Sequence, residues 1–146
     1  MTTATATLDH LPSATRPRGL HLALWSAQIV LAGVFLMTGG MKLVAPIAQL
    51  RAQLPWVSGV MGDAVRFIGL VEVLGALGLV LPASTRILPR LTPLAAAGLT
   101  TVMVLAMATH LSRGEYPMII ANLLLGGAAA FVTWGRAVRA PIAPRA

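Results

Sequence analysis

The stretch that most constrains the fold is an apolar run with a carboxylate near its middle, VRFIGLVEVLGALGLVLP at residues 65–82. The run is long enough to cross a lipid bilayer as a helix. An ionised side chain at that depth costs several kcal/mol unless it faces a partner or water. Other parts of the chain must therefore cover Glu72.

The composition agrees with a membrane protein. The 146 residues are 57% hydrophobic and only 10% charged, which is far more apolar than a soluble domain of this length needs to be. The net charge of +7 does not indicate nucleic-acid binding, because the arginines lie singly between apolar segments and form no basic stripe with aromatic residues. Cysteine is absent, so the chain carries no disulfide, thiolate metal site or thiol redox chemistry of its own.

Four segments have the length and apolar character of membrane spans, at about 21–44, 64–81, 92–110 and 116–135. Short connections join them, so we expect an all-α, integral membrane four-helix bundle with up-down-up-down topology over residues 21–136. Residues 1–20 are rich in Thr, Ala and Pro and predict a disordered cytoplasmic tail. Residues 137–146 form a second cytoplasmic tail.

Local signals set the expected helix ends. Asp63 is the expected N-cap of the second helix, and Pro82 is expected to stop that helix. Thr92 followed by Pro93 predicts the start of the third helix, and Pro117 opens the fourth. Residues 46–62 have a mixed character that predicts an interfacial, half-buried segment.

Orientation follows from the basic residues. Seven lie on one side of the predicted bundle and four on the other, namely Lys42, Arg51, Arg66 and Arg113. The excess of positive charge predicts that both termini are cytoplasmic in a multi-pass protein of the cell (inner) membrane. Trp25 and Trp134 then lie at the cytoplasmic interface, and Trp56 and Tyr116 at the outer interface.

Each predicted helix has one seam of small or polar residues, which in lipid marks the face that packs against other helices. The spacing alternates between four and three residues. The seams are Gln28, Ala32, Phe35, Gly39 and Lys42; Gly69, Glu72 and Ala76; Ala96, Thr100, Met103, Met107 and His110; and Asn122, Gly126, Ala129 and Thr133.

These seams predict a polar pocket open towards the outer side. Because the helices alternate in direction, the basic and imidazole groups near their outer ends gather at one face, while Glu72 and Asn122 lie deeper. The candidate pocket residues are Glu72 as the floor, with Lys42, Arg66, His110, Arg113, Glu115 and Asn122.

Simpler interpretations stay open for the same residues. Glu72 is equally well explained as an acceptor that clasps helices together through Lys42, Arg66 or Asn122. Arg66 lies six positions from Glu72 and well round the same helix, so a partner from another helix is favoured. His110 is more typical of a solvated helix end than of a ligand.

Haem and metal sites are disfavoured. His21 and His110 lie at opposite ends of the predicted bundle and cannot share one iron, and a pairing of His110 with Met37 or Met41 is a weak alternative. No group of carboxylates and histidines has metal-ligand spacing, so no metal site is predicted.

Several motifs together resemble the DoxX-like family of small four-helix membrane proteins. They are G-x-K-L at 40–43, RFIGLVEVLGALGLVLP at 66–82, LTPLAAAGL at 91–99, H-x-x-RGE at 110–115, Asn122 and the GR at 135–136. The resemblance covers residues 22–136. It implies a four-helix membrane fold, with Arg66, Glu72, His110, Arg113, Glu115 and Asn122 at the family-like polar positions, and it brings no defined cofactor ligand.

The family resemblance also implies an association with quinone-linked membrane oxidoreductases or with resistance to oxidants. Two classes of function therefore stay open. One is a membrane subunit that binds a quinone in the pocket and works with a soluble or peripheral oxidoreductase subunit. The other is a non-catalytic anchor or scaffold for a partner protein. A stand-alone enzyme or carrier for a small lipophilic compound is a third alternative, and neither catalysis nor homo-oligomer formation is decided by the sequence.

Overall fold

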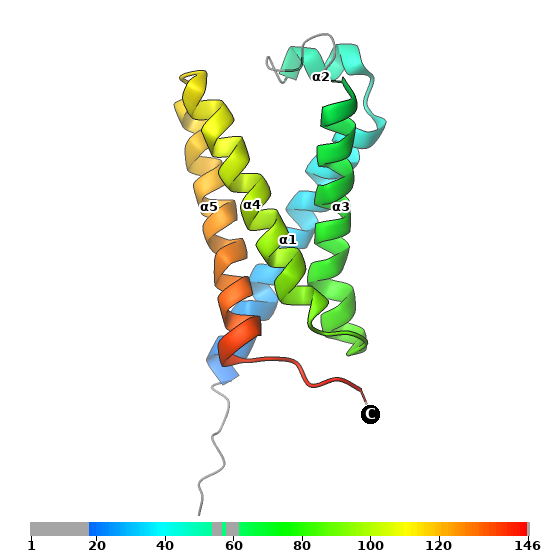
Figure 1. The fold of residues 1–146 in the computed structure, drawn as a ribbon, viewed down its shortest axis with the longest axis vertical. Coiled ribbons are helices and arrows are strands. Elements are labelled where there is room, and N and C mark those ends of the chain that lie inside the picture. Colours follow the sequence, from blue (N-terminus) through cyan, green and yellow to red (C-terminus); the bar gives the residue numbers. More distant parts are fainter. Residues whose placement is uncertain (1–17, 54–56, 58–61, 146) are drawn as a thin grey trace, which may run out of the picture.

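The computed structural model describes residues 18–53, 57 and 62–145, and this part of the chain is helical without strands. The helices are α1 (Arg18–Val44), α2 (Ile47–Gln53), α3 (Gly62–Thr85), α4 (Leu91–Ser112), α5 (Tyr116–Trp134) and the five-residue π-helix η2 (Gly135–Arg139) (Figure 1). Among the described residues four helices are long and apolar enough to cross a membrane. The predicted all-α fold with four membrane-length helices is confirmed.

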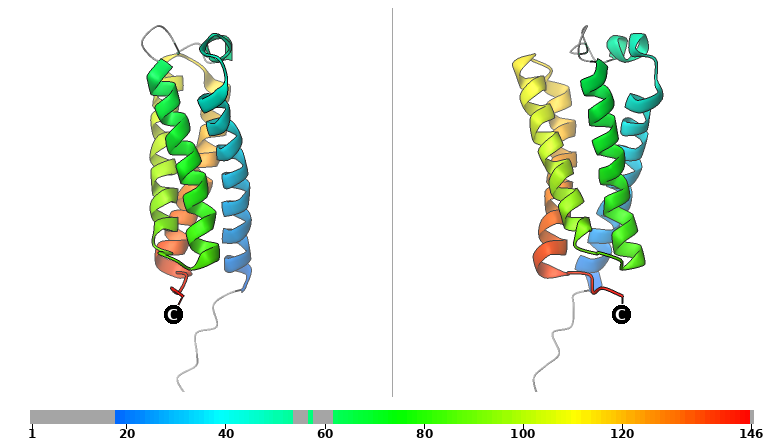
Figure 2. Two further views of the ribbon diagram at one scale, coloured as in Figure 1. Left: turned by 90° about the vertical axis from the view of Figure 1, so that its right-hand side faces the viewer. Right: turned by 45° about the vertical axis from the view of Figure 1, so that its right-hand side comes forward.

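Successive long helices run in opposite directions, so their connections alternate between two ends of the bundle (Figures 1 and 2). We name these ends by their contents. The α2 end carries α2 and the 113–115 turn. The arginine end carries both ends of the described chain and six basic residues, which are Arg18, Arg86, Arg90, Arg136, Arg139 and Arg145.

The bundle is closed at the arginine end and splayed at the α2 end, where α1 and α3 lie apart from α4 and α5 (Figure 1). Within the bundle α1 packs mainly on α3 and α4 mainly on α5, with α3 against α4 as the next most extensive contact. The main apolar core occupies the closed half. Its largest fully buried members are Phe35, Leu24, Leu31, Leu79, Leu99 and Val132.

The predicted seams largely face the interior. The buried members are Gln28, Ala32, Phe35, Gly39, Gly69, Glu72, Ala76, Ala96, Met103, Gly126 and Ala129. The flanking Leu, Val and Ile side chains are exposed on the outer surface of the bundle, as expected for a surface in contact with lipid. The alternation of small and apolar residues was therefore a correct guide to which face of each helix packs inward.

Two glycines set the spacing between α1 and α3. A Cβ at Gly39 would lie 2.8 Å from the Gly69 carbonyl oxygen, and a Cβ at Gly69 would lie 2.8 Å from the Gly39 carbonyl oxygen. The two backbones are thus in direct contact, which only glycine allows. Glu72 lies beside Gly39 and Lys42 beside Gly69, so the two side chains stand on either side of this crossing and reach each other across it.

The predicted stop at Pro82 was wrong, because α3 continues to Thr85 with Pro82 inside the helix. Proline lacks the N–H that would continue the ladder. Side-chain donors add hydrogen bonds to carbonyl groups near Pro82. Gln28 Nε2 donates to the Leu79 carbonyl oxygen at 2.5 Å, and the Ser84 and Thr85 hydroxyls donate to the Leu81 carbonyl oxygen.

Two predicted N-caps also lie one residue inside their helices. Asp63 is the second residue of α3, where its charge still lies in the first turn and favours the positive end of the helix dipole. Thr92 is the second residue of α4, whose N-cap is Arg90, and its buried hydroxyl has no hydrogen-bond partner among the residues that the structure describes. Packing against the closed core, rather than side-chain capping, fixes this end of α4.

The structure describes the predicted tails and the first connection in part. Residues 18–20, assigned to the first tail, begin α1, whereas residues 1–17 lie outside the described part of the chain. In the C-terminal segment Ala140 is buried and the Arg145 N–H donates to the Arg86 carbonyl oxygen at 3.0 Å. The first half of the 46–62 segment is α2, which packs through Leu50 on Val65. Trp56 is outside the described residues.

Candidate functional site

Glu72 is held by a lysine from the neighbouring helix. Lys42 Nζ lies 2.7 Å from Glu72 Oε1 and 2.6 Å from Oε2, and the Thr38 hydroxyl donates to Oε2 at 3.3 Å. The side chains of Glu72 and Lys42 are 3% and 14% exposed. The expectation that another helix supplies the partner of Glu72 is confirmed. Thr38, one turn before Lys42, was not singled out from the sequence, although its spacing places it on the same side of α1.

Arg66 has a different role from the one expected. Its guanidinium donates to the carbonyl oxygens of Lys42 and Ala45, the latter at 2.7 Å. These carbonyls belong to the last turn of α1 and the residue after it, which have no helical donors of their own. Arg66 therefore caps the end of α1 and fixes the position of the Lys42 backbone, but it does not line the cavity described next.

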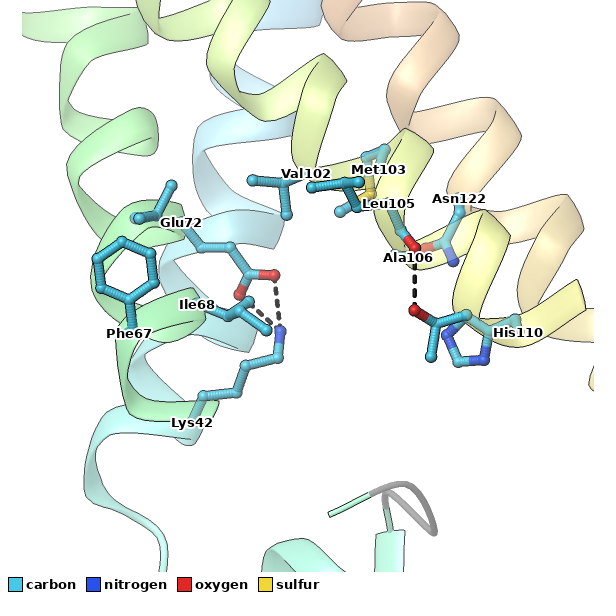
Figure 3. A pocket seen from close by; sticks show the side chains of 12 residues that line it. Lys42, Phe67, Ile68, Glu72, Val102, Met103, Leu105, Ala106, His110 and Asn122 are labelled. Carbon is cyan, nitrogen blue, oxygen red and sulfur yellow. Dashed lines mark hydrogen bonds and ion pairs between the residues drawn. The ribbon is translucent and has the colours of Figure 1, made fainter. Parts of the chain in front are cut away.

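A cavity of about 310 Å³ lies between the two helix pairs in the splayed half of the bundle. Of the seven candidate residues, Lys42, Glu72, His110 and Asn122 line it. The remaining wall is apolar and comes from α3 and α4, namely Phe67, Ile68, Val71, Val102, Met103, Leu105 and Ala106, with Thr109 at the edge. In Figure 3, Lys42 and Glu72 lie on one side of the cavity and His110 and Asn122 on the other.

His110 is oriented by the turn that follows α4. Its Nδ1 lies 2.6 Å from Glu115 Oε2, and Arg113 Nε donates to Glu115 Oε1 at 2.8 Å. The Glu115 backbone N–H also donates to the His110 carbonyl oxygen at 2.9 Å. An ionised carboxylate only accepts hydrogen bonds, so Nδ1 carries a hydrogen in this contact. Nε2 is the ring nitrogen that Glu115 does not engage.

The same turn favours the ionised form of Glu115. The hydrogen bond from Arg113, followed by the one from His110, lowers the pKa of Glu115 below its ordinary value. Gly114, between Arg113 and Glu115, has a φ of 71°, a conformation that glycine adopts without strain. Arg113 and Glu115 thus act behind His110 and do not line the cavity.

Asn122 is the polar group that α5 brings to the cavity. Its amide Nδ2 is buried and has no hydrogen-bond partner within the described part of the protein. A buried amide without a partner costs about 1–3 kcal/mol. This cost is offset if a molecule in the cavity accepts a hydrogen bond from it.

The positions of the remaining sequence-level candidates bear on cofactors. Met37 and Met41, considered as partners of His110, are exposed on α1 and do not line the cavity. His21 lies at the opposite end of the bundle, where Trp25 Nε1 donates to its Nε2 at 3.1 Å. Among residues 18–53, 57 and 62–145, no three His, Asp or Glu side chains are grouped as metal ligands.

A second buried polar cluster, at the arginine end, was missed. Arg136 is 3% exposed, donates from Nε to Gln28 Oε1 at 2.7 Å and stacks over the Trp25 ring at 5.5 Å. The sequence placed Gln28 on the packing seam but interpreted Arg136 only as a topology signal. The π-helical turn of η2 directs Arg136 inward and joins the end of α5 to α1.

The fold and this interior define a multi-pass membrane protein, a bundle of four apolar helices with an ion pair inside it. The family model described as the DoxX-like family matches residues 26–132. The chain therefore belongs to the DoxX-like family. No curated protein and no solved structure matches the chain.

Proposed function

We propose that this protein is the membrane subunit of a quinone-linked oxidoreductase or oxidant-resistance system, and that its cavity binds the ring of a quinone. The observation that carries the proposal is the distribution of polar groups. Hydrogen-bonding side chains stand on two opposite sides of the cavity, with an apolar wall between them. A para-quinone has the matching pattern, a flat apolar ring with an oxygen atom at each end.

The residues present fit such a ring. Lys42 Nζ is a charged donor on one side, and the Asn122 amide and the His110 ring are available on the other. The volume of about 310 Å³ is at the lower end of the range for small-molecule sites, and its mostly apolar lining is typical of them. Charge-assisted hydrogen bonds to carbonyl oxygens would fix the orientation of the ring.

The same side chains are suited to supplying protons. A quinone takes up two electrons and two protons to become a hydroquinone, and each proton must arrive at a ring oxygen. When its ring is protonated, His110, held at Nδ1 by Glu115, carries a hydrogen on Nε2 as well and can give it to the oxygen at one end of the quinone ring. Lys42 and Glu72 stand at the other end, where the proton shared within the ion pair is close to the second oxygen.

The two electrons that reduce the quinone must come from a partner protein in this proposal. The chain contains no cysteine, and no cofactor ligands were identified in its sequence. We therefore assign electron transfer to a soluble or peripheral oxidoreductase subunit, with the present protein supplying the site, the orientation of the ring and the protons. The charge distribution supports a cell (inner) membrane orientation with the arginine end, and hence both termini, in the cytoplasm.

A second candidate function is a non-catalytic anchor for a partner protein. The observation that favours it is the mutual pairing of Lys42 and Glu72, which links α1 to α3 with no need for a ligand. In that case the cavity would be filled by lipid. The two candidates differ in whether a quinone binds to the isolated protein.

The test measures the dissociation constant of a chainless dimethoxy-methyl-para-benzoquinone for the full-length protein in lipid nanodiscs by titration calorimetry. We expect saturable binding, and we expect His110→Gln to weaken it about tenfold or more through loss of a charge-assisted hydrogen bond. His21→Gln is the matched control, since His21 lies at the other end of the bundle, and it should leave the constant within twofold. An absence of saturable binding to the wild-type protein would overturn the proposal and favour the anchor.

A further inference from the structure

A shallow apolar groove runs along the surface between α3 and α4, with a volume of about 340 Å³. It begins at Val71, a residue that also lines the cavity, so the groove and the cavity adjoin at this side chain. From there it extends towards the arginine end. Its lining is made only of Val, Leu, Gly and Ala side chains, namely Val71, Leu74, Gly75, Gly78, Leu91, Leu94, Ala95, Gly98 and Leu99.

The depth of the groove comes from missing side chains. A Cβ at Gly78 would lie 2.7 Å from the Ala95 Cβ, so α3 and α4 are in close contact there. Gly98 differs, because a Cβ built on it meets nothing within 4 Å. At Gly98 the groove therefore has free space that a larger side chain can fill.

The cavity opens on the same lipid-facing surface as the groove. Two of its wall residues, Phe67 on α3 and Leu105 on α4, are 66% and 63% exposed. A molecule that entered the cavity sideways from the hydrocarbon phase would meet these two side chains. Any part of it that stayed outside the cavity would be close to Val71, where the groove begins.

We propose that the groove holds the hydrocarbon chain of the molecule whose ring occupies the cavity, so that the ligand is a chain-bearing lipid quinone. This inference rests on the proposed function. The polar groups lie in the half of the bundle nearest the α2 end, and the groove leads from Val71, near the middle of the span, through the apolar half towards the arginine end. This is the orientation that a polar ring with an apolar chain adopts in a bilayer.

The length of the groove suits such a chain. Its α3 edge runs from Val71 to Gly78, which corresponds to about 10 Å of helix and to roughly eight methylene groups in an extended chain. The surrounding lipid is as apolar as the groove, so the chain gains little from the hydrophobic effect. The chain adds to the binding free energy through close carbon–carbon contacts, and each contact contributes only a small amount.

The experiment compares two probes in lipid nanodiscs, the chainless benzoquinone and the same ring carrying a decyl chain. We expect the decyl probe to bind more tightly to the wild-type protein. Gly98→Leu should weaken the decyl probe about tenfold, since it removes on the order of ten carbon contacts, and leave the chainless probe within twofold. Replacing glycine by leucine inside α4 improves helix propensity, so the variant is expected to fold.

Gly127→Leu is the matched control. Gly127 is an exposed glycine of α5 where a Cβ also meets nothing within 4 Å, and it lies outside both the cavity and the groove. This variant should bind both probes as the wild-type protein does. The control separates filling of the groove from the general effect of placing leucine on a lipid-facing helix.

Each other outcome overturns the inference in a recognisable way. If both probes bind and Gly98→Leu leaves the decyl probe unchanged, the groove does not hold the chain, while the proposed function stands. If Gly98→Leu instead converts a dimer into a monomer, the groove is covered by a second copy of the chain. If neither probe binds to the wild-type protein, the proposed function fails, and this inference fails with it.

Discussion

Removing one partner of the Lys42–Glu72 pair should be far more damaging than removing both. The two side chains are 14% and 3% exposed, and Nζ lies 2.6 Å from the nearer carboxylate oxygen. With an effective dielectric constant of about 20, their attraction is about 6 kcal/mol. Desolvation of the two ions offsets most of this, but a single ion left behind keeps its desolvation cost without its partner.

Glu72→Gln and Lys42→Met should therefore each lower the free energy of unfolding by about 3–5 kcal/mol. The double variant buries no charge, and we expect it to lose about 1 kcal/mol or less. The coupling energy between the two positions is then at least about 5 kcal/mol in magnitude. Asp63→Asn is the matched control, because it removes a carboxylate from an exposed position of the same helix and should change stability by less than about 0.5 kcal/mol.

The assay is thermal unfolding in one fixed detergent, followed by circular dichroism for the four variants and the wild-type protein. We expect each single variant at Lys42 or Glu72 to melt at least about 10 °C below the wild-type protein, and the double variant to recover most of that loss. A double variant that is as unstable as the two single variants combined would refute the reasoning. The pair would then not be coupled, and the contact between α1 and α3 would rest on the Gly39–Gly69 crossing alone.

Two further predictions concern the ends of the bundle. The hydrogen bonds that lower the pKa of Glu115 stabilise the folded state above the ordinary carboxyl pKa of 4.5, and this contribution is lost as the pH falls through the lowered value. The melting temperature of the wild-type protein should accordingly fall towards that of Glu115→Gln below pH 4.5, and a constant difference between them would contradict this. The orientation in the membrane can be tested with single cysteines, because the chain has none of its own and both ends of the bundle have exposed serines. A membrane-impermeant maleimide should label Ser112→Cys in intact cells and Ser84→Cys only after permeabilisation. The reverse pattern would invert the proposed topology.

The parts of this protein that could be predicted from sequence are those set by helix periodicity and by the cost of burying charge. Glu72 needed a partner, and its distance round the helix disfavoured Arg66, which left Lys42 and Asn122 of other helices as candidates. The small and polar seams identified the inward faces because lipid provides no other reason for glycine and alanine to recur at that spacing. Both features depend on local geometry that the sequence specifies directly.

The features that could not be predicted depend on distances between helices. Arg66 reaches the carbonyl groups at the end of α1 only because α1 and α3 approach closely at Gly39 and Gly69. The sequence does not give this distance between the helices, so Arg66 was predicted at the cavity rim. Pro82 was a local stop signal that tertiary contacts overrode. The inward turn of Arg136 needs a π-helical turn, which shifts its direction relative to the apolar period and leaves no signal in the spacing.

The location of the packed core has a mechanical consequence. Because the large buried side chains are confined to the half near the arginine end, the two helix pairs resemble arms joined at one end and free at the other. A given change of crossing angle at the joint is amplified with distance along the arms. The width between Lys42 and His110 thus depends on the packing around residues such as Gln28, which lies beside the joint and does not line the cavity.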